Sequence, residues 1–289
     1  MNHHRPGSKT SAQVWTLDGD TGRWRPDHLA TEEPMEIRLV AGGARHTVAI
    51  TMRTPGHDFE LAAGFLHAEG IIASRDAIAG IGYCVDPGID AAQQYNIVNV
   101  TLRPGIAPDL APLERNFLTT SACGVCGKAS LDALKLRGCP VISPGPEVTA
   151  DVLYGLPDTL RAAQGVFDRT GGLHAAALFD PDGSLIALRE DIGRHNAVDK
   201  LIGWALLEGR VPLGDTILMV SGRTSFEILQ KALAAGIPVV CAVSAPSSLA
   251  VDLAREFGVT LVGFLREKRC NVYAGRQRIL LPAPAIVTP

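Results

Sequence analysis

The chain has 289 residues, of which 46% are hydrophobic and 20% charged, and its formal net charge at pH 7 is −3. This length allows one large domain or two of ordinary size, with the hydrophobic content of a globular protein. The small net charge argues against bulk attraction to nucleic acid or to an anionic membrane, and six cysteines in so long a chain argue against a disulfide scaffold.

Residues 1–30 are polar and rich in Gly, Arg and Asp, which predicts a flexible tail. The tail lacks the apolar core of a secretory signal peptide. No apolar run along the chain approaches the roughly 18 residues that a membrane-spanning helix needs. We therefore expect a cytoplasmic protein that has neither a membrane nor a nucleic acid as a partner.

Residues 31–118 have the pattern of a small α+β domain. Gly42 and Gly43 separate two strand-like runs, which is a hairpin signal, and Asp58 begins a helical pattern that ends near Gly70. Prolines follow the last predicted strand, as in a linker. The predicted elements are strands at 35–40 and 46–52, a helix from 58 to about 70, and strands at 78–84 and 95–102.

Two cysteines open the C-terminal domain, which we place at residues 119–289. Gly124 and Gly127 keep bulky side chains away from Cys123 and Cys126, and a helical pattern follows. Positive potential at a helix N-terminus lowers a thiol pKa and favours the thiolate that sulfur chemistry needs. The pattern alone leaves three interpretations open: a redox or sulfur-carrying pair, half of a zinc site, or a tight turn without chemistry. A second C-x-x-C or an H-x₃₋₅-H motif that would complete a zinc site does not occur in the sequence.

Strands and helices alternate in the second half of this domain. Such alternation predicts parallel strands with right-handed crossovers, and Thr224 with Glu227 predicts a capping box at the start of one helix. The predicted elements are strands at 173–179 and 184–188, a helix around 198–206, a strand at 216–220, a helix at 224–235, a strand at 239–243, a helix at 247–257 and a last core strand at 260–264.

Three of these strands run into polar loops. Ligands of parallel α/β sheets bind beyond the carboxyl ends of the strands, and hydroxyl-rich helix N-termini beside arginines suit phosphate. The loops therefore predict a site for an anionic ligand such as a nucleotide. The alternative is that the hydroxyls only cap helices and the basic side chains are only solvated. The loops are 221–225, which includes Ser221 and Arg223, then 244–248 and 266–269.

A second polar cluster lies between a predicted strand and a predicted helix, at residues 189–196. Asp191 and His195 stand out in it, because a carboxylate can orient an imidazole. His174 is another candidate. For each of these residues a structural role is the alternative, and the sequence assigns no function to any of the three.

Six segments now stand in an order that closely resembles the FdhD family, the formate dehydrogenase accessory sulfurtransferases. The resemblance covers nearly the whole chain after the N-terminal tail. The segments are ELAAGFL at 60–66, CGVCG at 123–127, GGLH at 171–174, DIGRHNAVDK at 191–200, SGRTS at 221–225 and APSS at 245–248.

The resemblance implies a sulfurtransferase that works through a cysteine persulfide. It implies that a cysteine desulfurase supplies the sulfur, and that the acceptor is the molybdenum cofactor, in its bis(molybdopterin guanine dinucleotide) form, before it enters formate dehydrogenase. Cys123 corresponds to the persulfide carrier and Cys126 to the cysteine that supports it. The cofactor is then a bound substrate, which GDP mimics in part, and no permanently bound metal is expected. The family's cofactor-binding segment corresponds by position to Phe264, Leu265, Arg266, Glu267, Lys268 and Arg269.

The resemblance also implies a fold and an assembly. The expected fold class is α/β, with the small α+β domain followed by a cytidine deaminase-like three-layer α/β domain, and the expected assembly is a homodimer. Two other functions compete. A non-catalytic chaperone would hold the molybdenum cofactor without moving sulfur. A zinc deaminase would use H-x-E followed by P-C-x-x-C; this chain has His67-Ala68-Glu69, but Ala122 replaces the proline.

Overall fold

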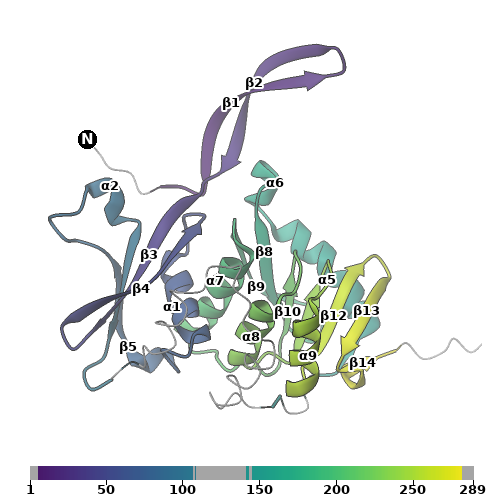
Figure 1. Cartoon of the computed structure of the whole chain (residues 1–289). Helices are drawn as coiled ribbons and strands as arrows, with labels where there is room; N and C mark the ends of the chain where they lie inside the picture. The colour runs from purple at the N-terminus through teal and green to yellow at the C-terminus, as the bar shows by residue number, and fades with distance from the viewer. Residues whose placement is uncertain (1–5, 107, 109–140, 143–144, 282–289) are drawn as a thin grey trace, which may run out of the picture. The chain divides into compact units, whose positions relative to one another are not determined.

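The computed structural model describes residues 6–106, 108, 141–142 and 145–281. The described part is a mixed α/β structure, and the chain folds into two compact units (Figure 1). Unit 1 comprises Met1–Thr120, Gln164–Ala175 and Arg189–Gly209, and unit 2 comprises Ser121–Ala163, Ala176–Leu188 and Arg210–Pro289. Two segments of unit 1 thus come from the stretch that the sequence pattern assigned to the domain at 119–289.

Unit 1 is built on an antiparallel hairpin, as the sequence predicted. β3 and β4 pair across Gly42 and Gly43, which both have positive φ values. In the described part of unit 1 the sheet order is β4-β3-β6-β5, with β3 and β6 parallel. The elements are β3 (Glu33–Ala41), β4 (Ala44–Arg53), α1 (Asp58–Ala68), η1 (Arg75–Ala77), β5 (Ile78–Tyr83), α2 (Ala91–Gln94), β6 (Ile97–Leu102), α6 (Phe167–Thr170) and α7 (Arg194–Leu207).

Helices α1 and α7 approach each other at two glycines. A Cβ on Gly64 would overlap the carbonyl oxygen of Asp199, and a Cβ on Gly203 would overlap that of Glu60. The two backbones are therefore closer than any larger residue allows. This contact explains why α7, which follows α1 far along the sequence, belongs to unit 1.

The N-terminal segment is a hairpin, so the expectation of a loose tail is wrong for residues 9–30. β1 (Lys9–Asp18) and β2 (Thr21–Ala30) pair in an unbroken antiparallel register, in which Trp15 faces Trp24. The two indole rings meet edge to face with centroids 6.0 Å apart. Most side chains on both faces of this ribbon are at least partly exposed, so the sequence lacks the apolar–polar alternation that marks a half-buried strand.

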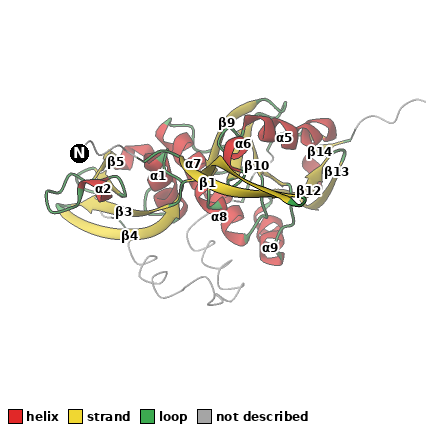
Figure 2. Ribbon diagram, turned by 90° about the horizontal axis from the view of Figure 1, so that it is seen from above, coloured by secondary structure: helices red, strands yellow, loops and turns green. Residues whose placement is uncertain are grey.

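In the described part of unit 2, six strands form a sheet in the order β13-β12-β11-β10-β8-β9. β10, β11 and β12 are parallel, as predicted, whereas β8 and β13 run antiparallel to their neighbours β10 and β12. Helix α5 covers one face of this sheet and α8 and α9 cover the other, which makes three layers (Figure 2).

The strands of this sheet are β8 (His174–Phe179), β9 (Leu185–Asp191), β10 (Ile217–Val220), β11 (Val239–Ala242), β12 (Thr260–Arg266) and β13 (Arg269–Ala274). The helices are α5 (Ala150–Ala163), α8 (Phe226–Ala234) and α9 (Ser248–Phe257), with η2 (Arg276–Arg278) and a short parallel pair of strands, β7 (Val148–Thr149) and β14 (Ile279–Leu280). Besides β1 and β2, the sequence pattern missed α2, α5, α6, β7, β13, β14 and the short helices η1 and η2. Among the described residues, no helix has the length and apolar character that crossing a bilayer would require.

Candidate functional site

Cys123 and Cys126 lie outside the described residues, so their predicted role stays a prediction. The other predicted site residues are at the carboxyl edge of the unit 2 sheet. We define this carboxyl edge as residues 221–225, 243–248 and 264–269, which follow or end β10, β11 and β12.

Backbone hydrogen bonds join the first two of these loops. The Val243 amide donates to the carbonyl of Val220 (3.3 Å), and the Thr224 amide donates to the carbonyl of Ala245 (3.3 Å). In return, the Ser247 amide donates to the Thr224 carbonyl (2.9 Å). The loop that holds Ser221 and Arg223 therefore lies directly beside the 243–248 loop.

The third loop joins the same edge. The Phe264 amide donates to the Ser244 carbonyl (3.1 Å), and Gly263 packs so tightly that a Cβ there would lie 3.1 Å from the same oxygen. Phe264 itself has φ 53°, a left-handed conformation that costs a bulky residue energy; strained residues of this kind cluster at functional sites. The structure thus brings together the loops that sequence reasoning predicted to meet.

The edge carries net positive charge, because four basic side chains accompany one acid, Glu267. Arg223, Arg266, Lys268 and Arg269 are exposed, and none of the four has an ion pair among the described residues. Phe264 is 36% exposed, whereas Leu265 is fully buried and belongs to the core. Exposed arginine forks beside two helix N-termini fit the charge of a phosphate-bearing ligand.

Two hydroxyls of the edge cap helices. The Ser225 hydroxyl accepts from the Ile228 amide (3.5 Å), and the Ser247 hydroxyl accepts from the Ala250 amide (3.3 Å). The predicted capping box at Thr224 is therefore wrong by one residue. Thr224 is buried in the bridge to Pro246, and its hydroxyl has no hydrogen-bond partner in the described part.

The polar cluster at 189–196 contains a buried ion pair in unit 1. Lys200 Nζ lies 2.6 Å from Asp191 Oδ2, with side chains only 1% and 0% exposed. The Asp191 carboxylate also accepts from the amides of Thr54 (3.1 Å) and Gly193 (2.8 Å) and from Asn196 Nδ2 (3.1 Å). These contacts give Asp191 a structural role.

The same cluster gathers basic side chains near the start of α7. Burial holds the pKa of His174 below its ordinary value, and the charges of Arg194 and His195 act in the same direction, while Asp191 opposes them. Sequence reasoning singled out His174 and His195 but missed Lys200. The position of Lys200 in the DIGRHNAVDK segment can be read from the sequence, but its burial depends on the packing of α1 against α7.

A second buried network supports α1. Arg53 Nε donates to Asp58 Oδ1 (3.1 Å), and Arg53 Nη2 donates to Asn96 Oδ1 (3.0 Å). Tyr83 donates its hydroxyl to the other oxygen of Asp58 (2.9 Å). His67, the first residue of the deaminase-like H-A-E triplet, is buried in α1 with its Nδ1 3.2 Å from the Ile72 carbonyl. Within the described residues, no group of three or more His, Cys, Asp or Glu side chains is arranged to hold a metal ion.

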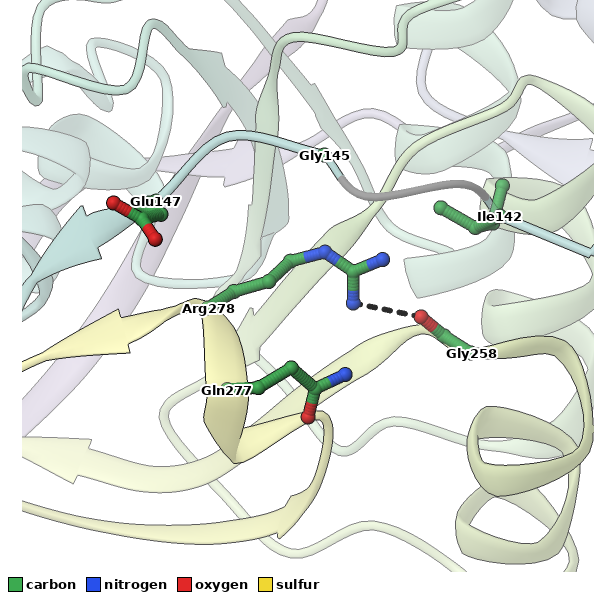
Figure 3. A pocket seen from close by; sticks show the side chains of 6 residues that line it. All are labelled: Ile142, Gly145, Glu147, Gly258, Gln277 and Arg278. Atoms are coloured by element: carbon green, nitrogen blue, oxygen red, sulfur yellow. Dashed lines mark hydrogen bonds between the residues drawn. The ribbon is translucent and has the colours of Figure 1, made fainter.

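A cavity of about 400 Å³ lies elsewhere in unit 2, near the amino end of β12 (Figure 3). Arg278 crosses it and donates to the Gly258 carbonyl (2.7 Å). Burial lowers the pKa of this arginine. The cavity contains none of the predicted site residues; it is lined by Ile142, Gly145, Glu147, Gly258, Gln277 and Arg278.

The chain is similar to known proteins over most of its length. Residues 30–280 match the model of the FdhD/NarQ family. A sulfur carrier protein FdhD from Streptomyces avermitilis is 58% identical over 264 residues, covering 90% of this chain and 92% of that protein. One from Mycobacterium tuberculosis is 55% identical over 272 residues, covering 92% and 97%.

A solved structure from Desulfotalea psychrophila, described as that of a formate dehydrogenase accessory protein, superimposes with a TM-score of 0.72. It is 24% identical in sequence, and the match covers 94% of this chain and 99% of that one. At this identity the likeness concerns the fold.

Proposed function

The chain belongs to the FdhD/NarQ family, and we propose that it is a sulfurtransferase that supplies persulfide sulfur to the molybdenum cofactor of a formate dehydrogenase. The observation that carries this proposal is the match to curated sulfur carriers at 58% and 55% identity over about nine-tenths of the chain. We further propose that the protein acts as a homodimer in the cytoplasm and that a cysteine desulfurase donates the sulfur.

The chemistry begins at Cys123. Its thiolate attacks the outer sulfur of the desulfurase persulfide, a new S–S bond forms, and the desulfurase cysteine leaves as a thiolate. The cofactor is the acceptor substrate: it supplies the electron pair for the new sulfur bond, and Cys123 returns to the thiolate. Cys126 is proposed to resolve or relay the persulfide, because a nearby thiol can attack its inner sulfur, form a disulfide and expel hydrosulfide.

The carboxyl edge is the proposed binding site for the guanine nucleotide end of the cofactor. Arg266, Lys268 and Arg269 are exposed and have no ion pairs among the described residues, so phosphate would supply the missing charge. The exposed ring of Phe264 offers a surface on which a base can stack. Ser221 and Arg223 on the adjoining loop complete the proposed contacts.

Sulfur loading tests the catalytic part of the proposal. After incubation with a cysteine desulfurase and cysteine, mass spectrometry should find added sulfur on the Cys123 peptide. The Cys123→Ala protein should stay unloaded and fail to activate formate dehydrogenase, whereas Cys126→Ala should reduce activation without abolishing it. Full activation by Cys123→Ala would instead indicate a chaperone that holds the cofactor without moving sulfur.

Calorimetry with GDP tests the carboxyl edge. Loss of one charge-assisted contact costs about 1.5–3 kcal/mol, or roughly tenfold to a hundredfold in affinity. Arg266→Ala and Arg269→Ala should each weaken GDP binding by this amount, and their thermal unfolding should match that of the unchanged protein. Unaltered GDP affinity in the protein that carries both Arg266→Ala and Arg269→Ala would contradict this placement of the binding site.

A further inference from the structure

The ribbon formed by β1 and β2 has two outer edges, because no third strand in the described part of the chain pairs with it. A two-stranded ribbon is marginally stable by itself in water. Its exposed side chains include Trp15 (53% exposed), Leu17 (72%) and Trp24 (69%). An outer edge also presents backbone groups with which a further strand can pair. Whether the ribbon can take another strand therefore depends on what each edge presents.

One backbone hydrogen bond shows which residues face outward. Inward and outward backbone groups alternate along an antiparallel pair. The Thr31 amide donates to the Ser8 carbonyl (3.1 Å), so every second residue of β1 counted from Ser8 bonds across the ribbon, and the residues between them direct their N–H and C=O groups outward. The outward positions are Lys9, Ser11, Gln13, Trp15 and Leu17 on β1 and Gly22, Trp24, Pro26, His28 and Ala30 on β2.

The outer edge of β2 is protected against further pairing. Pro26 occupies an outward position and has no N–H to donate. The outward amide of His28 already donates to Asp27 Oδ1 (3.0 Å). Arg23 and Arg25 add charge to the same strand. Proline and charged side chains are the features by which natural sheets prevent pairing at an edge, so β2 is unsuited to accept another strand.

The outer edge of β1 has none of this protection. Residues 10–17 contain neither a charged side chain nor proline or glycine. Several of them are β-branched or aromatic, which favours an extended strand. In the part of the chain that the structure describes, no hydrogen bond engages the outward amides of this strand. The ribbon therefore has one closed edge and one open edge.

The charges of β1 favour a second β1 strand as the partner. The strand carries only two charges, Lys9 at its start and Asp18 at its end. When two such strands pair antiparallel about a two-fold axis at their centres, the Lys9 end of each lies beside the Asp18 end of the other. A parallel pair in register would instead bring like charges together. The two-fold pair leaves only the protected β2 strands outside, so the assembly closes at two copies.

We propose that the outer edge of β1 pairs with the outer edge of β1 in a second copy of the chain, which joins the two ribbons into one four-stranded antiparallel sheet. The inference rests on the homodimer proposed above and locates its interface in unit 1. An extended peptide of another protein can also add to a strand edge, but it would not account for the opposite charges at the two ends of β1.

A charge exchange at the centre of β1 tests the pairing. Gln13 lies close to the two-fold axis, so Gln13→Lys or Gln13→Glu places like charges from the two copies side by side. Each change alone should raise the dissociation constant of the dimer at least about tenfold, as measured by analytical ultracentrifugation of the full chain. An equimolar mixture of the two variants should dimerise again, because opposite charges then meet. The matched control is His28→Lys, which places the same charge on β2 and should dimerise as the unchanged protein does.

Amide hydrogen exchange of the unchanged protein tests the same interface without a substitution. The outward amides of β1, such as those of Gln13 and Trp15, should exchange slowly in the dimer and rapidly after dilution to the monomer. The outward amides of Gly22 and Trp24 on β2 should exchange rapidly in both states. This measurement decides the question if the Gln13 variants fail to fold.

The possible results separate this interface from the rest of the proposed function. A dimer that neither Gln13 substitution weakens, or rapid exchange at Gln13 and Trp15 in the dimer, would overturn this interface and leave the homodimer intact. A chain that stays monomeric would overturn both, and growth beyond two copies would contradict the closed edge at β2. Protection of the β1 amides only after formate dehydrogenase is added would assign the edge to that partner and overturn the proposal. Sulfur loading of Cys123 is measured independently of all these results.

Discussion

Breaking the buried ion pair between Lys200 and Asp191 should strongly destabilise unit 1. Lys200 Nζ has three acceptors: Asp191 Oδ2 at 2.6 Å and the carbonyls of Thr54 at 2.8 Å and Glu190 at 3.3 Å. Replacing Lys200 with Met keeps the length of the side chain but leaves a buried carboxylate without its cation. Removal of one partner from such a pair costs about 3–5 kcal/mol.

Tryptophan fluorescence can follow this loss, because the chain's three tryptophans, Trp15, Trp24 and Trp204, all belong to unit 1. Trp204 lies one turn beyond Lys200 on α7. With a urea dependence of about 2 kcal/mol per molar, Lys200→Met should lower the midpoint by about 1.5–2.5 M.

A double-mutant cycle sharpens the test. Lys200→Met combined with Asp191→Asn should cost about 1–3 kcal/mol less than the sum of the two single changes, because the pair is lost only once. The control is Arg45→Met, which breaks an exposed pair with Asp86 and should leave the midpoint nearly unchanged. A cost below about 1 kcal/mol for Lys200→Met, or strict additivity, would refute the reasoning.

Three further changes probe other parts of the structure. Gly64→Ala or Gly203→Ala should destabilise unit 1 by about 3 kcal/mol or more, because the new methyl group overlaps a backbone carbonyl of the facing helix; Gly80→Ala, with open space around it, is the control, and an equal urea midpoint for all three would contradict this packing. Burial raises the pKa of Glu60, but hydrogen bonds from Arg189 and His57 outweigh it and hold the pKa below its ordinary value. Glu60→Gln should therefore lower the free energy of unfolding of unit 1 at pH 7, and its difference from the unchanged protein should fade as the pH falls below about 4.5. A difference that stays constant down to pH 3 would show that the Glu60 carboxylate does not stabilise the unit. Burial strongly raises the pKa of the Cys241 thiol, so an alkylating reagent at pH 8 should label it only after unfolding; prompt labelling of the native protein would argue against a closed sheet core.

Local signals sufficed for much of the fold. Gly42 and Gly43 predicted the turn between β3 and β4, and the alternation after residue 216 predicted the parallel strands β10, β11 and β12. The position of the carboxyl edge followed from this topology, since strand ends of parallel neighbours meet at one edge. The boundaries of the two predicted domains and the roles of the edge residues stay predictions.

The misses have physical reasons. β1 and β2 form an exposed ribbon, so no buried face imposes alternation on Trp15 or Trp24. The burial of Lys200 depends on Gly64 and Gly203, which are distant in sequence and become informative only when α1 and α7 are known to touch. The burial of Arg194 Nε, which has no hydrogen-bond partner in the described part of the chain, is likewise a property of packing.

The discontinuous course of unit 1 has a consequence for biosynthesis. Its sheet and α1 are made early, but α7, against which Gly64 packs, is made only after much of unit 2. Until residue 209 leaves the ribosome, α1 lacks its partner helix and Thr54 lacks its bonds to Asp191 and Lys200. A nascent chain stalled at residue 118 should therefore be protease-sensitive and should engage chaperones. Unit 1 can therefore complete its fold only after α7 has been synthesised.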